Sequence, residues 1–447
     1  MQKKDVSEAS TLPAFWRDPQ VLKVGAGTVI VLLLLWTIMS QNFFGAKVSL
    51  SSSSAVPLRQ AIHDATTRAH LSSSLSSRAL SRPTFKRDGG LDFTLCHADL
   101  SSKDAASNIN ELARAIPISP ISGSSGGIDP FSPEGRNPEL YVASLVVSMK
   151  DDHLSSIALD YAPAAPVAAP TAPAPRQPES KARSKSYSLL LNKFNTVADH
   201  SLLVTDVFEP QTSPLDRLDV VAWYHAVNSC NAVGLFNSDS VAGASQRHKH
   251  VQVIPLDSFW PLRPTDAIYP LPLDHVILPA IIAGTLSPPS CGTLRAGLYP
   301  THTLALWPFK HRFAVISGIG ARHEEEREEG RECLYSKAFA AYSAVLADLG
   351  VDAAAAPASA SASASAAASP ASYNVVLTKH YVLAVLRSRP SAGLDSSSSA
   401  SSSSSSSVTV KVNGFGFLGM LLGRDAAAVE EIAAAGPMSV LRQVGVE

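Results

Sequence analysis

The stretch NSDSVAGASQRHKHVQVIPL, residues 237–256, alternates in its second half as a β-strand does. Three polar side chains share one face of this predicted strand: His248, His250 and Gln252. The other face carries Lys249 and two valines. One face is therefore available for chemistry, and the other is available for packing and for setting the register of the strand.

A turn of small residues precedes this strand and ends in a polar residue. It consists of Gly243, Ala244, Ser245 and Gln246. Because little side-chain bulk stands in the way, its backbone N–H groups can approach an anion closely. The turn and the polar strand face together predict one small anion-binding patch.

The pair of histidines has three interpretations. Both rings can bind one metal ion, but this needs a third protein ligand, and no cysteine or carboxylate stands nearby at ligand spacing. A neutral imidazole can instead attack phosphorus, since a histidine pKa of about 6.5 leaves most of the ring unprotonated at neutral pH. The third interpretation is two polar residues on an exposed strand. The pair alone leaves all three open.

The composition limits the partners and the compartment. A formal net charge of −1 over 447 residues gives no electrostatic reason to expect nucleic-acid binding. The widely spaced cysteines form no C-x-x-C, so neither a disulfide framework nor a thiolate zinc site is predicted, and a reduced, intracellular compartment is expected. The cysteines are Cys96, Cys230, Cys291 and Cys333.

The first 90 residues are predicted to be a leader. Residues 24–44 contain an apolar run that fits a short membrane anchor, and the basic residues on both sides leave its orientation open. A mis-extended start in front of a soluble protein explains the same run. The Ser- and Arg-rich part from residue 48 to residue 90 is expected to be a disordered tether.

Low-complexity runs divide the rest of the chain. Without the leader and these runs, roughly 290 residues remain, enough for one large domain or two fused modules. We predict a catalytic domain over 91–350 with a disordered insertion at 162–185, a linker at 351–372, and a C-terminal domain over 373–447 with a serine tract at 396–407.

Local patterns predict the elements around the histidines. Strands are predicted at 140–149, 187–194, 200–205, 313–316, 373–377, 382–386 and 408–412. Helices are predicted after Ser213 as N-cap, over 334–349 and over 425–435. Residues 255–308 are predicted to be rich in loops. The acidic run at 323–332 is read as a solvated helix start in preference to a metal site.

These blocks together resemble the diadenosine tetraphosphate phosphorylase, or ATP adenylyltransferase, family of the histidine-triad superfamily. The resembling stretches are residues 237–256, LLLNKFNTVADHSLLVTDVFEPQTSPL at 189–215, DPFSPEG at 129–135, YNVVLTKHYVLAVLRS at 373–388 and VNGFGFLGMLL at 412–422. The resemblance implies an α+β fold with an antiparallel sheet from two fused histidine-triad-like halves and helices packed on one side.

The same resemblance implies roles for individual residues. His250 would attack the α-phosphorus of an adenylyl group, His248 would support it, and Gln252 would bond a phosphate oxygen or the nucleophile. The implied nucleotide and phosphate contacts are Lys103, Asn192, Lys193, Asn237, Gly243, Ala244, Ser245, Gln246, Asn413, Gly414, Phe415, Met420 and Arg424. Arg424 stands where a lysine is common, and the segment around Lys103 lacks the usual arginine.

The implied reaction converts diadenosine tetraphosphate and inorganic phosphate to ATP and ADP. It needs no organic cofactor; a divalent cation such as magnesium is expected to come bound to the nucleotide. A cytoplasmic monomer that binds no nucleic acid is expected, with a membrane contact only through residues 24–44. Two alternatives stay open: a sugar-phosphate nucleotidyltransferase of the same superfamily and a non-catalytic, membrane-anchored dinucleotide-binding protein.

Three positions separate these relatives. Gln252 stands where the hydrolases of the superfamily carry a third histidine, which favours a transferase. Lys249 and Val251 stand where the sugar-nucleotide transferases typically carry Pro and Gly, which favours the dinucleotide branch.

Overall fold

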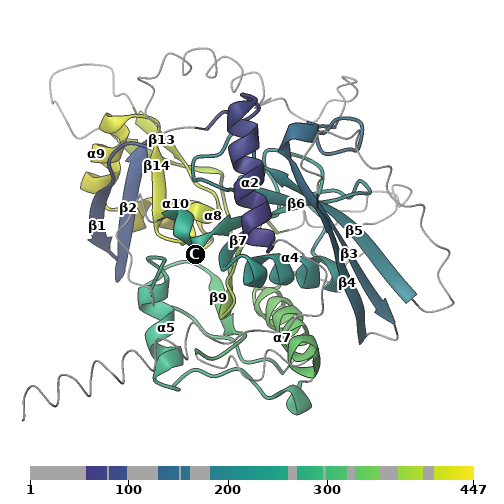
Figure 1. Ribbon diagram of the computed structural model, residues 1–447. Coiled ribbons are helices and arrows are strands. Elements are labelled where there is room, and N and C mark those ends of the chain that lie inside the picture. Colours follow the sequence, from purple (N-terminus) through teal and green to yellow (C-terminus); the bar gives the residue numbers. More distant parts are fainter. Residues whose placement is uncertain are drawn as a thin grey trace, which may run out of the picture. The chain divides into compact units, whose positions relative to one another are not determined.

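The computed structural model describes ten stretches of the chain, all within one compact unit, Val56–Glu447 (Figure 1). They are residues 57–77, 80–97, 129–150, 153–161, 182–259, 269–294, 298–319, 328–352, 371–395 and 407–447. The expected membrane segment, Lys103 and the low-complexity runs lie outside these stretches, except at a few run-end residues. Within them, no helix is long and apolar enough to cross a bilayer.

A nine-stranded antiparallel sheet carries the structure. Its strands follow the order β4-β3-β5-β6-β8-β7-β10-β11-β9. Their bounds are β3 Tyr141–Lys150, β4 His153–Tyr161, β5 Ala182–Leu191, β6 Ser201–Thr205, β7 Ala232–Asn237, β8 His250–Pro255, β9 His311–Val315, β10 Tyr373–Leu377 and β11 Tyr381–Leu386. The strands predicted at 187–194 and 200–205 pair as the hairpin β5–β6, and those predicted at 373–377 and 382–386 pair as the hairpin β10–β11. The predicted α+β class is likewise confirmed by this sheet and its helices.

Both faces of the central strands are buried. Val375 packs in one apolar cluster with helices α2 (Leu58–Leu71), α4 (Arg217–Ser229) and α7 (Glu328–Ala347). Its neighbour Val376, on the other face, packs in a second cluster with α5, α9 and α10. The expectation of helices on one side is therefore wrong, because these strands are apolar at successive positions, as doubly covered strands are.

The second face is covered by the C-terminal part of the chain together with two smaller sheets. One sheet has the order β1-β2-β14, in which β14 runs parallel to β2. The remaining bounds are β1 Thr84–Asp88, β2 Leu91–His97, β12 Ser391–Asp395, β13 Ser407–Lys411, β14 Met420–Gly423, α5 Asp274–Ile282, α8 Gly414–Phe417, α9 Ala426–Ala435 and α10 Pro437–Val444. Short 3-10 helices lie at Pro138–Leu140, Leu256–Phe259 and Cys291–Thr293.

The N-terminal part of the compact unit is ordered where a tether was expected. Helix α2 buries four residues at helical spacing: Leu58, Ile62, Ala65 and Ala69. Asp88, at the end of β1, accepts a hydrogen bond from Met438 N at 2.8 Å. The disordered-tether prediction is therefore wrong for the described part of residues 57–90. The amphipathic pattern of α2 is short, and the serine-rich sequence on both sides made the region resemble a disordered segment.

Helix α4 begins later than predicted. Asp216 is the N-cap, and a capping box links its side chain to Asp219 N at 2.9 Å and the Asp219 side chain back to Asp216 N at 3.0 Å. Ser213 instead lies in a turn, with its N–H bonded to Pro210 O. Helices α5 and α10 were not predicted. In the sequence, Pro279 inside α5 and the pair formed by Gly436, the N-cap of α10, and Pro437, its first residue, indicate helix breaks.

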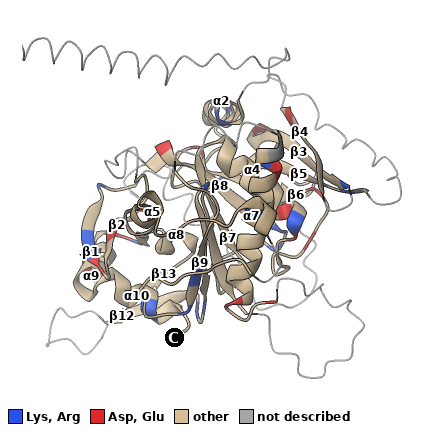
Figure 2. Cartoon of the chain, turned by 90° about the horizontal axis from the view of Figure 1, so that it is seen from below, with Lys and Arg blue, Asp and Glu red and all other residues tan. Residues whose placement is uncertain are grey.

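Two cysteines are paired against expectation. Cys291 and Cys333 form a disulfide with their Cα atoms 5.7 Å apart, whereas Cys96 and Cys230 are free and buried. A separation of 42 residues without a local motif gave no signal for this pair. Basic and acidic residues are interspersed along the described elements, and most of the ribbon is uncharged (Figure 2), as the small net charge requires.

Candidate active site

The histidine pair lies at the start of β8 and just before it. His250 is the first residue of β8, opposite Val204 of β6. His248 precedes the strand and pairs with Pro210 in an isolated bridge, so the prediction of one continuous strand through both histidines is wrong. The two rings still converge, because Phe131 contacts both, with centroid distances of 5.3 Å to His250 and 6.1 Å to His248.

The His250 ring is held in one tautomer. Its Nδ1 lies 2.9 Å from the His248 carbonyl oxygen, which can only accept, so Nδ1 carries the hydrogen and Nε2 keeps its lone pair. Burial lowers the pKa of His250 to about 4, and the bond to the carbonyl only partly opposes this effect. At neutral pH the ring is therefore an uncharged base with Nε2 unprotonated.

His248 contributes its backbone to this arrangement. Its ring Nδ1 lies 2.7 Å from Asp129 Oδ2, and its Nε2 lies 2.7 Å from the Thr205 carbonyl oxygen. Both ring nitrogens are thus occupied, and the ring is only 2% exposed. The group of His248 that reaches His250 is the main-chain carbonyl, whose direction the anchored ring fixes.

Gln252 faces a buried histidine that the sequence analysis had not selected. Its strand partner is Leu202, which lies on the same face as His200 two residues earlier. Burial lowers the pKa of His200 to about 4, and the neighbouring Gln252 side chain partly opposes the shift. Asn192 Nδ2 lies 3.4 Å from His200 Nδ1. The alternation along β6 was the available signal for His200.

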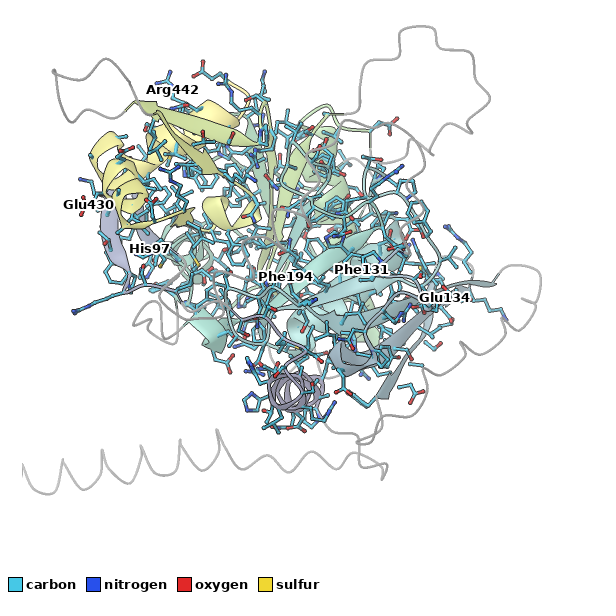
Figure 3. All side chains as sticks on the ribbon, turned by 90° about the horizontal axis from the view of Figure 1, so that it is seen from above. His97, Phe131, Glu134, Phe194, Glu430 and Arg442 are labelled. Carbon is cyan, nitrogen blue, oxygen red and sulfur yellow. A yellow bond between two sulfur atoms is a disulfide. The ribbon has the colours of Figure 1, made fainter. Side chains whose placement is uncertain are left out.

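The loop that carries Asp129 and Phe131 is fixed by Arg136. The guanidinium donates to the Phe131 carbonyl at 3.3 Å, to Asp206 Oδ1 at 3.4 Å and to the Ser188 hydroxyl. Figure 3 labels Phe131 in the central part of the molecule. DPFSPEG at 129–135 was one of the stretches that resemble the family, and no local pattern pointed to its partners.

The small-residue turn packs against the C-terminal block. Gly243 has φ +99, and a Cβ added there would lie 2.7 Å from Asn413 Cβ. The Gly243 and Ala244 N–H groups donate within the turn, to the Ser240 and Asp239 carbonyls. The expectation that these two N–H groups face an anion is therefore wrong, because the turn uses them to close itself.

Asn237 links this turn to the C-terminal block. Its Oδ1 accepts from Gly414 N at 3.1 Å and from Asn374 Nδ2 at 2.7 Å. Asn374 Nδ2 also donates to the Ala242 carbonyl at 2.8 Å. Asn237 is only 4% exposed, so its carboxamide oxygen holds the site together from within.

The remaining predicted contacts divide into two groups. Phe415 is buried with its ring 5.9 Å from the His200 ring, and Met420 is buried on β14. Asn413 caps α8 by accepting from Phe415 N at 3.1 Å. Arg424 is different, because its exposed guanidinium bonds Asp425 Oδ2 at 3.0 Å beside the start of α9.

Three further predicted residues are less closely tied to this cluster. Lys193 Nζ lies 5.3 Å from the centroid of the Phe194 ring. Ser245 is exposed and Gln246 half-buried at the end of the turn. No group of three His, Cys, Asp or Glu residues able to hold a metal ion occurs among the residues that the structure describes.

These observations define a class of protein. His250 is a buried, neutral histidine with an open Nε2 at the start of a strand in an antiparallel sheet, an arrangement that a group-transfer enzyme can use. Residues 177–277 match the Ap4A phosphorylase N-terminal domain, and residues 306–447 match the ATP adenylyltransferase C-terminal domain. The chain belongs to the Ap4A phosphorylase / ATP adenylyltransferase family, where Ap4A is diadenosine tetraphosphate.

Two relatives from Saccharomyces cerevisiae are similar over a short region. Protein APA1 is 34% identical over 80 residues, covering 16% of this chain and 25% of the relative. Diadenosine 5',5'''-P1,P4-tetraphosphate phosphorylase 2 is 37% identical over 81 residues, covering 15% of this chain and 24% of the relative. The aligned region thus spans about a quarter of the length of each relative.

Solved structures extend the similarity to the whole fold. The crystal structure of yeast Ap4A phosphorylase Apa2 has a TM-score of 0.51 at 18% identity, covering 88% of this chain and 98% of that protein. The structure of Apa2 in complex with Ap4A gives the same TM-score at 17% identity. At this identity the comparison establishes the fold.

Proposed function

We propose that this enzyme transfers the adenylyl group of Ap4A to inorganic phosphate through a covalent adduct on His250. The observation that carries the proposal is the bond from His250 Nδ1 to the His248 carbonyl, which leaves Nε2 unprotonated and directed away from that bond. The binding of Ap4A and AMP to Apa2, stated for that protein, supports the choice of substrate.

The first step forms a bond between Nε2 and the α-phosphorus. The bond from that phosphorus to the bridging oxygen breaks, and ATP leaves with the electron pair. As the ring becomes positively charged, the bond from Nδ1–H to the His248 carbonyl strengthens, so this contact stabilises the transition state more than the ground state. The anchored His248 ring keeps that carbonyl in place.

The second step regenerates the enzyme. An oxygen of inorganic phosphate attacks the same phosphorus, the P–Nε2 bond breaks, and ADP is released. The sum is Ap4A and phosphate to ATP and ADP. Asp129, a carboxylate beside the histidine pair, already bonds His248, and no group of three metal-binding side chains occurs among the described residues. A magnesium ion would therefore be held mainly by the nucleotide phosphates.

Product analysis tests this proposal. Purified full-length protein is incubated with Ap4A, magnesium and phosphate, and the nucleotides are separated by chromatography. We expect equal amounts of ATP and ADP, no turnover without phosphate, and an acid-labile adenylyl group on His250 when phosphate is omitted. A parallel incubation with UDP-glucose and a sugar phosphate separates the sugar-nucleotide alternative. Tight Ap4A binding without any product would leave the dinucleotide-binding alternative and refute the proposal.

A further inference from the structure

Gln211 makes an unusual set of contacts with the backbone of the nucleophile. Its side-chain Oε1 accepts from His250 N at 2.7 Å, and its Nε2 donates to the His250 carbonyl at 3.1 Å. The same Nε2 donates to the Asn237 carbonyl at 2.7 Å. Gln211 is 3% exposed. Both N–H groups of its carboxamide donate to main-chain carbonyls, and the carboxamide oxygen accepts from a main-chain N–H.

The Gln211 carboxamide replaces the backbone hydrogen bonds that β7 and β8 would otherwise form at this position. Strands β7 and β8 pair directly from Ala232 opposite Pro255 to Leu235 opposite Gln252. Two residues further in that register, Asn237 would face His250. There the amide of Gln211 lies between the two backbones and supplies the donors and the acceptor of a peptide group. The two strands are thus separated at the nucleophile and still joined.

Backbone hydrogen bonds also join the segment around Gln211 to the residues just before His250. Gln211 N donates to the Arg247 carbonyl at 2.7 Å, and Lys249 N donates to the Glu209 carbonyl at 2.7 Å. Both ends of the segment from Arg247 to His250 are therefore bonded to residues 209–211. This explains why β8 begins only at His250.

We propose that Gln211 is a positioning residue that sets the place of His250 relative to Asn237 and the groups that Asn237 holds. Asn237 bonds Gly414 and Asn374, so one carboxamide connects the nucleophile to both the small-residue turn and the C-terminal block. The proposal rests on the adenylyl transfer proposed above. It adds a residue that shapes the attack without contacting the reacting atoms.

Glutamine suits this place for a chemical reason. A carboxylate of the same length would keep the acceptor for His250 N but would turn an oxygen toward two carbonyl oxygens, at 2.7 and 3.1 Å in the present geometry. Protonating that carboxylate would restore one donor. The substitution Gln211→Glu therefore creates a pH-dependent defect, which a general loss of stability does not predict.

The test compares Gln211→Ala and Gln211→Glu with a matched control, Tyr299→Phe. Tyr299 also donates a buried bond to a strand carbonyl, that of Val315 on β9, at the edge of the same sheet. We expect the rate of adenylyl transfer to His250 in a single turnover to fall about 100-fold in Gln211→Ala, because a nucleophile displaced by about 1 Å loses that much. The KM for Ap4A should change less than threefold, and the control should keep its rate.

The Gln211→Glu variant supplies the second readout and replaces the alanine variant if that variant does not fold. Its rate should recover relative to wild type as the pH is lowered from 7.5 to 5.5. Wild-type rates in either folded Gln211 variant, or a loss confined to KM, would overturn the positioning role.

Failure of the proposed function is recognised separately. If wild-type protein gives no ATP and ADP from Ap4A, the positioning role is tested by the nitrogen NMR shifts of the His250 ring, which report its tautomer. Loss of the Nδ1–H tautomer in the folded Gln211 variants then supports the positioning role, and an unchanged tautomer overturns it.

Discussion

Lys249, just before β8, and His250, its first residue, point to opposite faces of the sheet and are held by different kinds of contact. Ionic contacts hold Lys249, and uncharged groups hold His250. Behind the strand, Lys249 Nζ bonds Glu209 Oε2 at 2.6 Å, Asp219 Oδ2 at 3.2 Å and the Pro214 carbonyl at 3.1 Å. Lys185 bridges the same two carboxylates, at 2.5 and 2.6 Å. In front, His250 is bonded only by uncharged groups, the His248 carbonyl and the Gln211 carboxamide.

The difference shows where charge is placed around a histidine that stays neutral, as the proposed nucleophile must. A carboxylate next to the ring would favour the imidazolium form, raise the pKa and remove the lone pair from Nε2. The ionic contacts that fix the segment lie on the face that Lys249 occupies, and the face of His250 has neutral donors and acceptors. Asp129, the carboxylate bonded on the front, contacts the His248 ring.

The largest expected effect comes from removing the nucleophile. His250→Asn should lower turnover by about four to six orders of magnitude, because the covalent path is lost. The affinity for Ap4A should change less than threefold, and thermal stability should stay near that of wild type, since no ion pair is broken. Chromatographic assay of ATP and ADP and calorimetric titration measure the two quantities. Full activity in this variant would rule out the covalent mechanism.

Removing the Lys249 ion pairs should lower stability and leave turnover nearly unchanged. Lys249→Met leaves the partly buried Glu209 and the buried Asp219 with Lys185 as their remaining cation, and we expect a loss of about 3 kcal/mol in the free energy of unfolding. Turnover of the folded protein should stay within about fivefold of wild type. Denaturant unfolding and steady-state assays test this pair of outcomes. A variant of unchanged stability that turned over 100-fold more slowly would place Lys249 in the chemistry.

The dependence of rate and stability on pH tests whether the surroundings of His250 keep its ring neutral. With the pKa of His250 lowered to about 4, the single-turnover rate should be constant from pH 8 to pH 5.5 and should fall about tenfold by pH 3 in protein that remains folded. His200 and His250 take up protons near pH 6.5 when unfolded, so stability should decrease as the pH falls from 6.5 toward 4. A rate that halved near pH 6.5 would contradict the neutral environment.

The smallest effect is expected at an exposed ion pair. Arg424 is mostly exposed beside Asp425, so Arg424→Lys should change the free energy of unfolding by less than about 0.5 kcal/mol, in contrast to Lys249→Met. The KM for Ap4A should change less than twofold. A tenfold increase in KM would return Arg424 to the nucleotide-binding residues that the resemblance implied.

The sequence was informative where a pattern was local. Alternation after His248 placed Lys249 and two valines behind the sheet, and Val251 and Val253 indeed lie in the apolar cluster there. The blocks around His250 indicated the family that the domain matches then established. Local patterns fix which side chains share a face, whereas the role of His250 as nucleophile came from the family resemblance and stays a prediction.

Other features depended on residues far apart in the chain. Asp129 meets His248 across 119 positions, and Gln211 meets His250 across 39, so no spacing rule pointed to either contact. Pro210 pairs with His248 and ends the regular strand there, which alternation could not indicate. The disulfide and helix α2 were missed because composition averaged over a region conceals a few buried side chains.

One contact described above also bears on the order of events during synthesis. The bond from Gly414 N to Asn237 Oδ1 joins positions 177 residues apart, and the Asn237 strand pairs with residues near 374. Contacts of such high sequence separation form slowly, since a long loop must close before they are made. A nascent chain that already contains His250 therefore lacks the partners of Asn237 until residues 374 and 414 have been synthesised.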